Sequence, residues 1–240
     1  MPIETPKLRG KTLIIPSVSI GNVPQLSVDL LVHNLPFEWA CSMDHTLLYP
    51  FASPVDSLDD EEPIDRGIST GIELYVDETH GLALVQQRSP ILPGYGYKFV
   101  QYLSQFIRES QFQSVVVLDS QDYTLKSTLD ASCPIEIVSN DLSEQFKQFS
   151  IEQEDNEEMV LSPYVRALTN AIKGVTTVYA VVMFVYEGDN RVDSQVLADK
   201  VLKLLTISSP AGQGWNHPKS WRSLYGDRPL PRGLEQGIYG

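Results

Sequence analysis

Two carboxylates at the end of an apolar run are the residues best suited to acid–base chemistry. Glu187 and Asp189 follow the apolar stretch 178–185, with Gly188 between them and Asn190 directly after. Ligands often bind at the carboxyl ends of parallel strands, where a carboxylate pair can act as acid and base. A glycine turn followed by Asp-Asn is also typical of a helix start, and no histidine or nucleophile accompanies it. We therefore favour a structural or interface role for Glu187, Asp189 and Asn190.

The segment 17–22 offers a second kind of chemistry, the binding of an anion. Gly21 and Asn22 lie where a predicted strand gives way to a predicted helix, and backbone amides at such a place can surround a phosphate. A phosphate here would make the chain a nucleoside-phosphorylase-like α/β enzyme or an anion-binding protein. The loop contains one glycine and lacks the spacing of known phosphate-binding loops. A structural turn at Gly21 is favoured, and the enzyme remains the alternative.

Other catalytic and metal-binding patterns are weaker. Residues 67–71 read G-x-S-x-G, but a nucleophile elbow needs a strand before its serine and a helix after it. Here an acidic segment precedes and a predicted strand follows. The four histidines, at positions 33, 45, 80 and 217, show no metal-ligand spacing. We expect no catalytic residue, no metal and no cofactor.

The C-terminal segment carries the residues best suited to binding a protein. The chain ends in Ile238, Tyr239 and Gly240, whose side chains could fill an apolar cleft while the carboxylate meets a lysine or backbone donors. Upstream, Trp221 and Tyr225 lie close together, and aromatic residues are frequent anchors of interfaces. We expect both aromatic side chains to pack onto the domain or onto a partner.

Composition narrows the classes of partner and the compartment. The net charge is −13, which argues against binding nucleic acid or an anionic membrane surface, because both require clustered Lys and Arg. The longest apolar run is far too short to span a bilayer. Only two cysteines occur, in apolar surroundings, which favours free thiols and a reducing compartment. We expect the protein in the cytoplasm or also in the nucleus.

The elements that must position these residues alternate along the chain. Apolar runs predict strands at 13–18, 37–43, 72–76, 82–86, 114–118, 135–138 and 178–185. Helical spacing predicts helices beginning near Val23, near Phe99, at Asp141 and after Asp189 or Asn190. Acidic loops are expected at about 53–71 and 151–158. Several predicted strands lack a polar face, so we expect a three-layer α/β sandwich with a mixed central sheet flanked by helices. It should form a single domain over residues 1–207, followed by an extended segment over 208–240.

Three blocks of this sequence together resemble one family. The first runs from Leu13 to Leu26 and continues through 29–31, and Gln86 to Pro90 is similar to a strand end of the same family. The second is 187–190 with Asp193, and the third comprises Pro218, Ser220, Trp221, Tyr225 and Gly226. In order and spacing these blocks resemble the proteasome assembly chaperone 2 family over nearly the whole chain.

The resemblance implies a chaperone without catalytic activity. Such proteins act as heterodimers with proteasome assembly chaperone 1, bind the α-subunit ring of the 20S proteasome and promote its assembly. The resemblance also implies that the hydrophobic–tyrosine–X terminus, here Ile238, Tyr239 and Gly240, enters pockets between neighbouring α subunits. Fungal members tend to carry that terminus, so the chain looks fungal-like. A third hypothesis, a structural subunit of another complex, would instead bury the terminus in its own protomer.

Overall fold

A computed structural model describes residues 8–58, 67–126, 134–139, 161–210 and 214–223. It contains one seven-stranded sheet with the strand order β2-β5-β6-β1-β7-β9-β8, and a separate two-stranded sheet of β3 and β4. The strands are β1 Thr12–Pro16, β2 Glu38–Ser42, β3 Ala52–Pro54, β4 Ile68–Thr70, β5 Ile72–Asp77, β6 Leu82–Gln87, β7 Ser114–Asp122, β8 Ile135–Ser139 and β9 Thr177–Val185. The helices are α1 Val23–Asn34, α2 Gly96–Ser110, α5 Pro163–Ile172 and α6 Arg191–Leu204, with short 3-10 helices at η2 Ile20–Asn22, η3 Tyr123–Leu125 and η6 Lys219–Ser223.

The sheet is mixed, and its parallel strands lie at the centre. β1 pairs in parallel with β6 on one side and with β7 on the other, and β7 pairs in parallel with β9. β2, β5 and β8 join through antiparallel pairs toward the two edges. Central parallel strands are covered on both faces, which explains why all but the first of the nine residues of β9 are buried.

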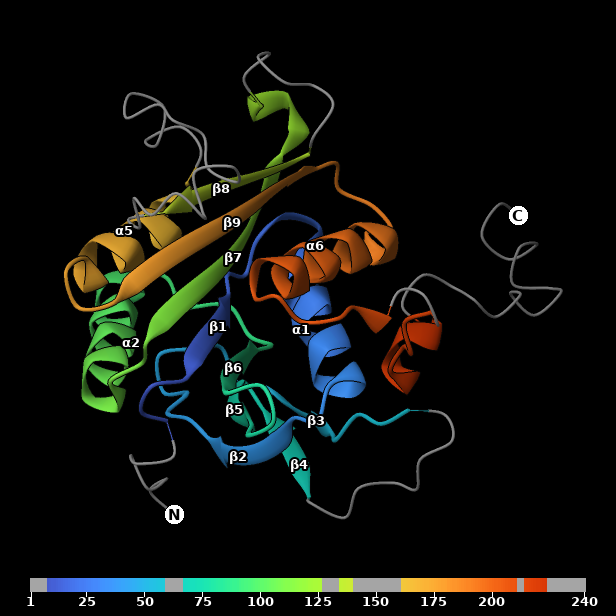
Figure 1. The fold of residues 1–240 in the computed structure, drawn as a ribbon, viewed down its shortest axis with the longest axis horizontal. Coiled ribbons are helices and arrows are strands. Elements are labelled where there is room, and N and C mark those ends of the chain that lie inside the picture. Colours follow the sequence, from blue (N-terminus) through green and yellow to red (C-terminus); the bar gives the residue numbers. More distant parts are fainter. Residues whose placement is uncertain (1–7, 59–66, 127–133, 140–160, 211–213, 224–240) are drawn as a thin grey trace, which may run out of the picture.

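Helices cover both faces of the sheet and complete the predicted three layers (Figure 1). One core lies between the sheet and the helices α2 and α5, and includes Phe99, Leu103 and Leu168. The other lies against α1 and α6, and includes Leu30 and Leu197. The three-layer α/β fold class is therefore confirmed.

Several boundaries differ from the prediction. Residues 53–71 were expected as loop, but β3 and β4 pair antiparallel across this segment, which its acidic composition concealed. Helix α5 was missed because its start is marked only by Ser162, whose hydroxyl accepts from Val165 N–H, and by Pro163. The helix expected at Asp141 and the acidic loop 151–158 lie outside the described residues. Across the described ranges, no helix is long and apolar enough to span a membrane.

Candidate functional site

The first two sequence blocks meet where Gly21 faces Asn190. Gly21 has a φ of +63°, and a Cβ placed on it would lie 2.4 Å from Asn190 Oδ1. Asn190 is buried; its oxygen accepts from Gly188 N–H at 3.1 Å, and its amide donates to Tyr186 O at 2.9 Å and to Asp193 Oδ2 at 2.8 Å. Gly21 is thus required both by its left-handed backbone and by the close approach of Asn190. The Asn190 side chain occupies the place that a side chain at position 21 would take.

Helix α6 begins where the sequence predicted, directly after Asn190. Asn190 holds the N-cap position, but its side chain makes no capping hydrogen bond to the helix. It bonds instead to the turn before it and to Asp193. Asp189, on the exposed surface, accepts from Arg191 N–H at 3.3 Å and from Arg191 Nη2 at 2.7 Å. These hydrogen bonds from Arg191 hold the pKa of Asp189 below its ordinary value.

Glu187 and Asp189 share a shallow surface cavity of about 400 Å³ with Tyr123, Tyr186 and Asp193. Both carboxylates are exposed, and Asp189 forms an ion pair with Arg191. The described residues hold no group of three or more His, Cys, Asp or Glu side chains suited to a metal ion. Ser69, the central serine of the G-x-S-x-G segment, lies within β4 and donates to Glu73 Oε2 at 3.0 Å. This is not the strand-to-helix turn of a nucleophile elbow.

A buried carboxylate that the sequence analysis did not single out lies within β7, beside the carboxyl end of β1. Open α/β sheets usually bind ligands near the carboxyl ends of their parallel strands. Asp119 is fully buried there and accepts from Ser17 Oγ at 2.6 Å, from Ser120 N–H at 3.0 Å and from Ser162 N–H at 3.2 Å. Burial raises the pKa of Asp119 despite these donors.

Two more hydroxyl contacts complete this cluster. Ser19 Oγ lies 2.8 Å from Ser120 Oγ, and Ser120 Oγ donates to Ile20 O at 2.7 Å. The hydroxyl and carboxylate groups at this edge of the sheet therefore form hydrogen bonds with one another. A signal for Asp119 existed, because it directly follows the predicted strand 114–118.

Trp221 of the third block lies in the same core as the buried residues of α1. Trp221, in η6, is 2% exposed and belongs to the core beside α1 and α6. It borders a hollow of about 640 Å³ whose other walls are α1, the segment 51–57 and the end of β6. Asn22 lines the same hollow, so two of the predicted site residues, Asn22 and Trp221, share it.

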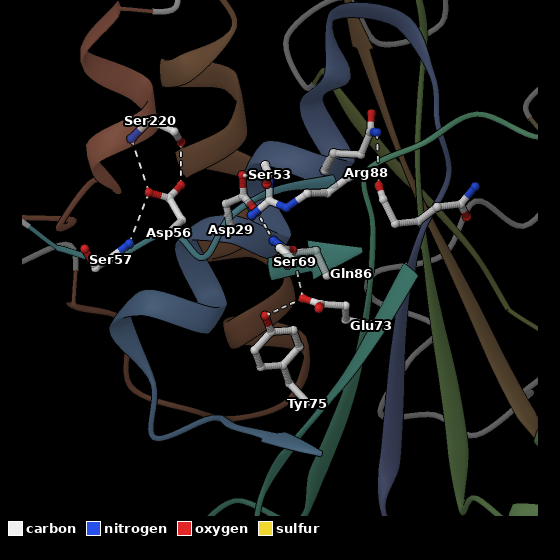
Figure 2. A network of polar contacts seen from close by, with 12 residues as sticks. Asp29, Ser53, Asp56, Ser57, Ser69, Glu73, Tyr75, Gln86, Arg88 and Ser220 are labelled. Atoms are coloured by element: carbon white, nitrogen blue, oxygen red, sulfur yellow. Dashed lines mark hydrogen bonds and ion pairs between the residues drawn. The ribbon is translucent and has the colours of Figure 1, made fainter. Parts of the chain in front are cut away.

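A buried ion pair forms one wall of this hollow (Figure 2). Arg88 Nη2 lies 3.2 Å from Asp29 Oδ1, and Gln86 also donates to Asp29. The side chains of Asp29 and Arg88 are 6% and 21% exposed, so water screens their interaction little. Arg88, within the segment 86–90, thus connects β6 to α1 of the first block.

Comparison with known proteins decides the family. The family model described as "PAC2 family" matches residues 13–212, which is most of the chain. The chain belongs to the PAC2 family. The matched span includes the contact between Gly21 and Asn190, whereas Trp221 and the residues after it lie beyond it.

Relatives of this PAC2 family chain carry one name. Proteasome assembly chaperone 2 of Xenopus laevis is 27% identical over 237 residues, covering 90% of this chain and 91% of that protein. Its namesake in Saccharomyces cerevisiae is 34% identical over 104 residues, covering 40% and 37%. Pyrococcus furiosus PbaA, an archaeal homologue of proteasome-assembly chaperone, shares the fold with a TM-score of 0.63 and 9% identity, covering 84% of both chains. Its low identity makes it evidence for the fold alone.

Four of the predicted site residues, Tyr225, Ile238, Tyr239 and Gly240, lie outside the described residues. Of the others, Gly21 and Asn190 are in contact, Asn22 and Trp221 line the hollow, and Glu187 and Asp189 lie on the exposed surface. In this PAC2 family chain the described residues of the three sequence blocks thus pack around α1 and the start of α6.

Proposed function

We propose that this chain is a non-catalytic chaperone of 20S proteasome assembly. The observation that supports this most is the match to proteasome assembly chaperone 2 of Xenopus laevis over nine-tenths of both chains. In this proposal it pairs with proteasome assembly chaperone 1, binds the α-subunit ring and works in the cytoplasm or also in the nucleus. The terminal Ile238, Tyr239 and Gly240 dock between α subunits.

The packing of the carboxyl edge supports a role without catalysis. At the position where α/β enzymes commonly bind substrate, Asp119 is held by Ser17, Ser120 and Ser162. Asn190 lies where a side chain at position 21 would be, and Asn22 N–H donates to Ser19 O at 3.1 Å. The nucleoside-phosphorylase-like alternative needs an anion before Gly21, and it gains no support from this geometry.

The docking of the terminus is tested by removing it. Deletion of residues 238–240 is expected to weaken binding to purified 20S particles about tenfold or more, which corresponds to about 1.4 kcal/mol or more. The lost contacts are a buried tyrosine, an aliphatic side chain and a charge-assisted carboxylate contact. Binding is measured by interferometry on immobilised 20S particles, with the chain purified as its complex with the partner chaperone.

Two controls separate docking from damage to the domain. Addition of one alanine after Gly240 keeps every side chain but moves the carboxylate. This variant should also bind 20S particles more weakly than wild type. Co-purification of the partner chaperone should be unchanged in both variants. Binding to 20S particles that equals wild type in the deletion variant would show that the terminus does not dock.

A further inference from the structure

Exposed apolar side chains gather at the corner of the molecule where β9 ends and α6 begins. Tyr186 directly follows β9 and is 64% exposed, and Val192, in the first turn of α6, is 68% exposed. Leu125 in η3 is 58% exposed. Asp122 at the end of β7 is paired with Val185 at the end of β9, so η3 and Tyr186 leave the sheet together (Figure 1). Grouped apolar side chains in water mark a surface that binds another protein.

A cavity lies within this patch and has aromatic walls. Tyr123 and Tyr186 line the surface cavity of about 400 Å³ described above, with ring centroids 5.2 Å apart and an interplanar angle of 33°. The ammonium group of Lys126 lies 6.0 Å from the centroid of the Tyr123 ring. The faces of aromatic rings attract cations. The aromatic side of the cavity therefore favours a cationic group over an anion.

The other side of the cavity is acidic. Glu187, Asp189 and Asp193 line it. Arg191 neutralises Asp189, whereas Asp193 accepts from the neutral amide of Asn190 and keeps its charge. The carboxylate of Glu187 forms no ion pair with any residue that the structure describes. Carboxylates facing aromatic rings are complementary to a lysine or arginine side chain.

We propose that this cavity receives a lysine or arginine side chain of the partner chaperone, and that Leu125, Tyr186 and Val192 pack against apolar side chains around it. This inference rests on the proposed function. A permanently bound partner covers exposed apolar side chains, and interfaces of permanent complexes are more apolar than transient ones. The cavity is therefore assigned to the partner chaperone, and contact with the 20S particle instead is one outcome of the test.

Substitutions at Tyr186 and Glu187 test the two sides of the cavity. Tyr186→Ala removes an aromatic wall and should weaken pairing with the partner chaperone about tenfold or more. Glu187→Lys puts a like charge against the incoming cation and should also weaken pairing about tenfold or more. Glu187→Gln keeps the shape and removes the charge, so pairing should weaken roughly two- to fivefold and depend less on salt.

Matched controls lie in α2, which packs on the opposite face of the sheet from α6. Tyr97→Ala removes a tyrosine that is 75% exposed, and Glu109→Lys makes the same charge reversal at an exposed position. Each variant competes with the wild-type chain for the purified partner chaperone, and native mass spectrometry measures the ratio of the two complexes at equilibrium. Far-UV circular dichroism checks that every variant is folded. Both controls should pair as wild type does.

The outcomes separate this inference from the proposed function. Wild-type pairing by both Tyr186→Ala and Glu187→Lys would overturn the inference, and so would losses of equal size in the two α2 controls. Variants that pair normally but bind 20S particles more weakly would show that the cavity faces the 20S particle, which also overturns its assignment to the partner chaperone. A wild-type chain that does not pair with the partner chaperone would refute the proposed heterodimer itself.

Discussion

Substitution of Gly21 tests the contact that joins the first two sequence blocks. Gly21→Ala places a methyl group 2.4 Å from Asn190 Oδ1 and 2.7 Å from Asn190 Cγ, far inside van der Waals contact. The left-handed φ of +63° adds about 1–2 kcal/mol for a residue with a side chain. Displacement of Asn190 breaks hydrogen bonds to Gly188 and Tyr186, each worth about 1 kcal/mol. We expect a total loss of about 3 kcal/mol.

The free energy of unfolding is measured by urea titration, with circular dichroism as the signal. A loss of about 3 kcal/mol lowers the melting temperature by roughly 6–12 °C in a protein of this size. Gly81→Ala is the matched control, because Gly81 has a φ of +67° but nothing lies within 4 Å of an added Cβ. It should show the backbone cost alone, about 1–2 kcal/mol.

A double-mutant cycle isolates the side-chain contact. Asn190→Ala removes the atoms that the new methyl group would meet, so Gly21→Ala should cost less in that background than in wild type. Equal costs in the two backgrounds, together with a Gly21→Ala loss no greater than that of Gly81→Ala, would refute the reasoning. Asn190 would then move aside freely, and only the backbone would require glycine.

Two further predictions concern buried charge and pH. Arg88→Met should lower the free energy of unfolding by about 3 kcal/mol because it leaves Asp29 buried without its cation, and Asp29→Asn in that background should recover part of the loss, as urea titrations would reveal. Burial and the charge of Arg191 lower the pKa of His217 below 6.5, so the unfolded chain binds this proton more readily. The contribution of neutral His217 to stability is therefore complete above about pH 6.5 and is lost as the pH falls below it. His217→Gln should flatten that part of the stability profile, and profiles of equal slope between pH 5 and 7 would contradict the assignment.

The sequence predicted the fold class well because the signals for it are local. Unbroken apolar runs such as 178–185 and 115–118 predict strands buried on both faces, and helical spacing predicts the helices between them. Local signals failed where a feature depends on distant residues. The pairing of β3 with β4 within an acidic stretch is such a case. Helix α5 was missed for another reason, because its local start signal, Ser162 and Pro163, was overlooked.

The candidate site divides in the same way. The need for a turn at Gly21, the polar start of the last helix and the aromatic character of Trp221 are properties of neighbouring residues, and the sequence by itself determined them. Only the tertiary structure decided that Asn190 lies where a side chain at position 21 would be, that Asp119 is buried among serines and that Tyr123 lies beside Tyr186. The physical reason is that a side chain reports its local preference, whereas its partner depends on strand order and helix packing over the whole chain.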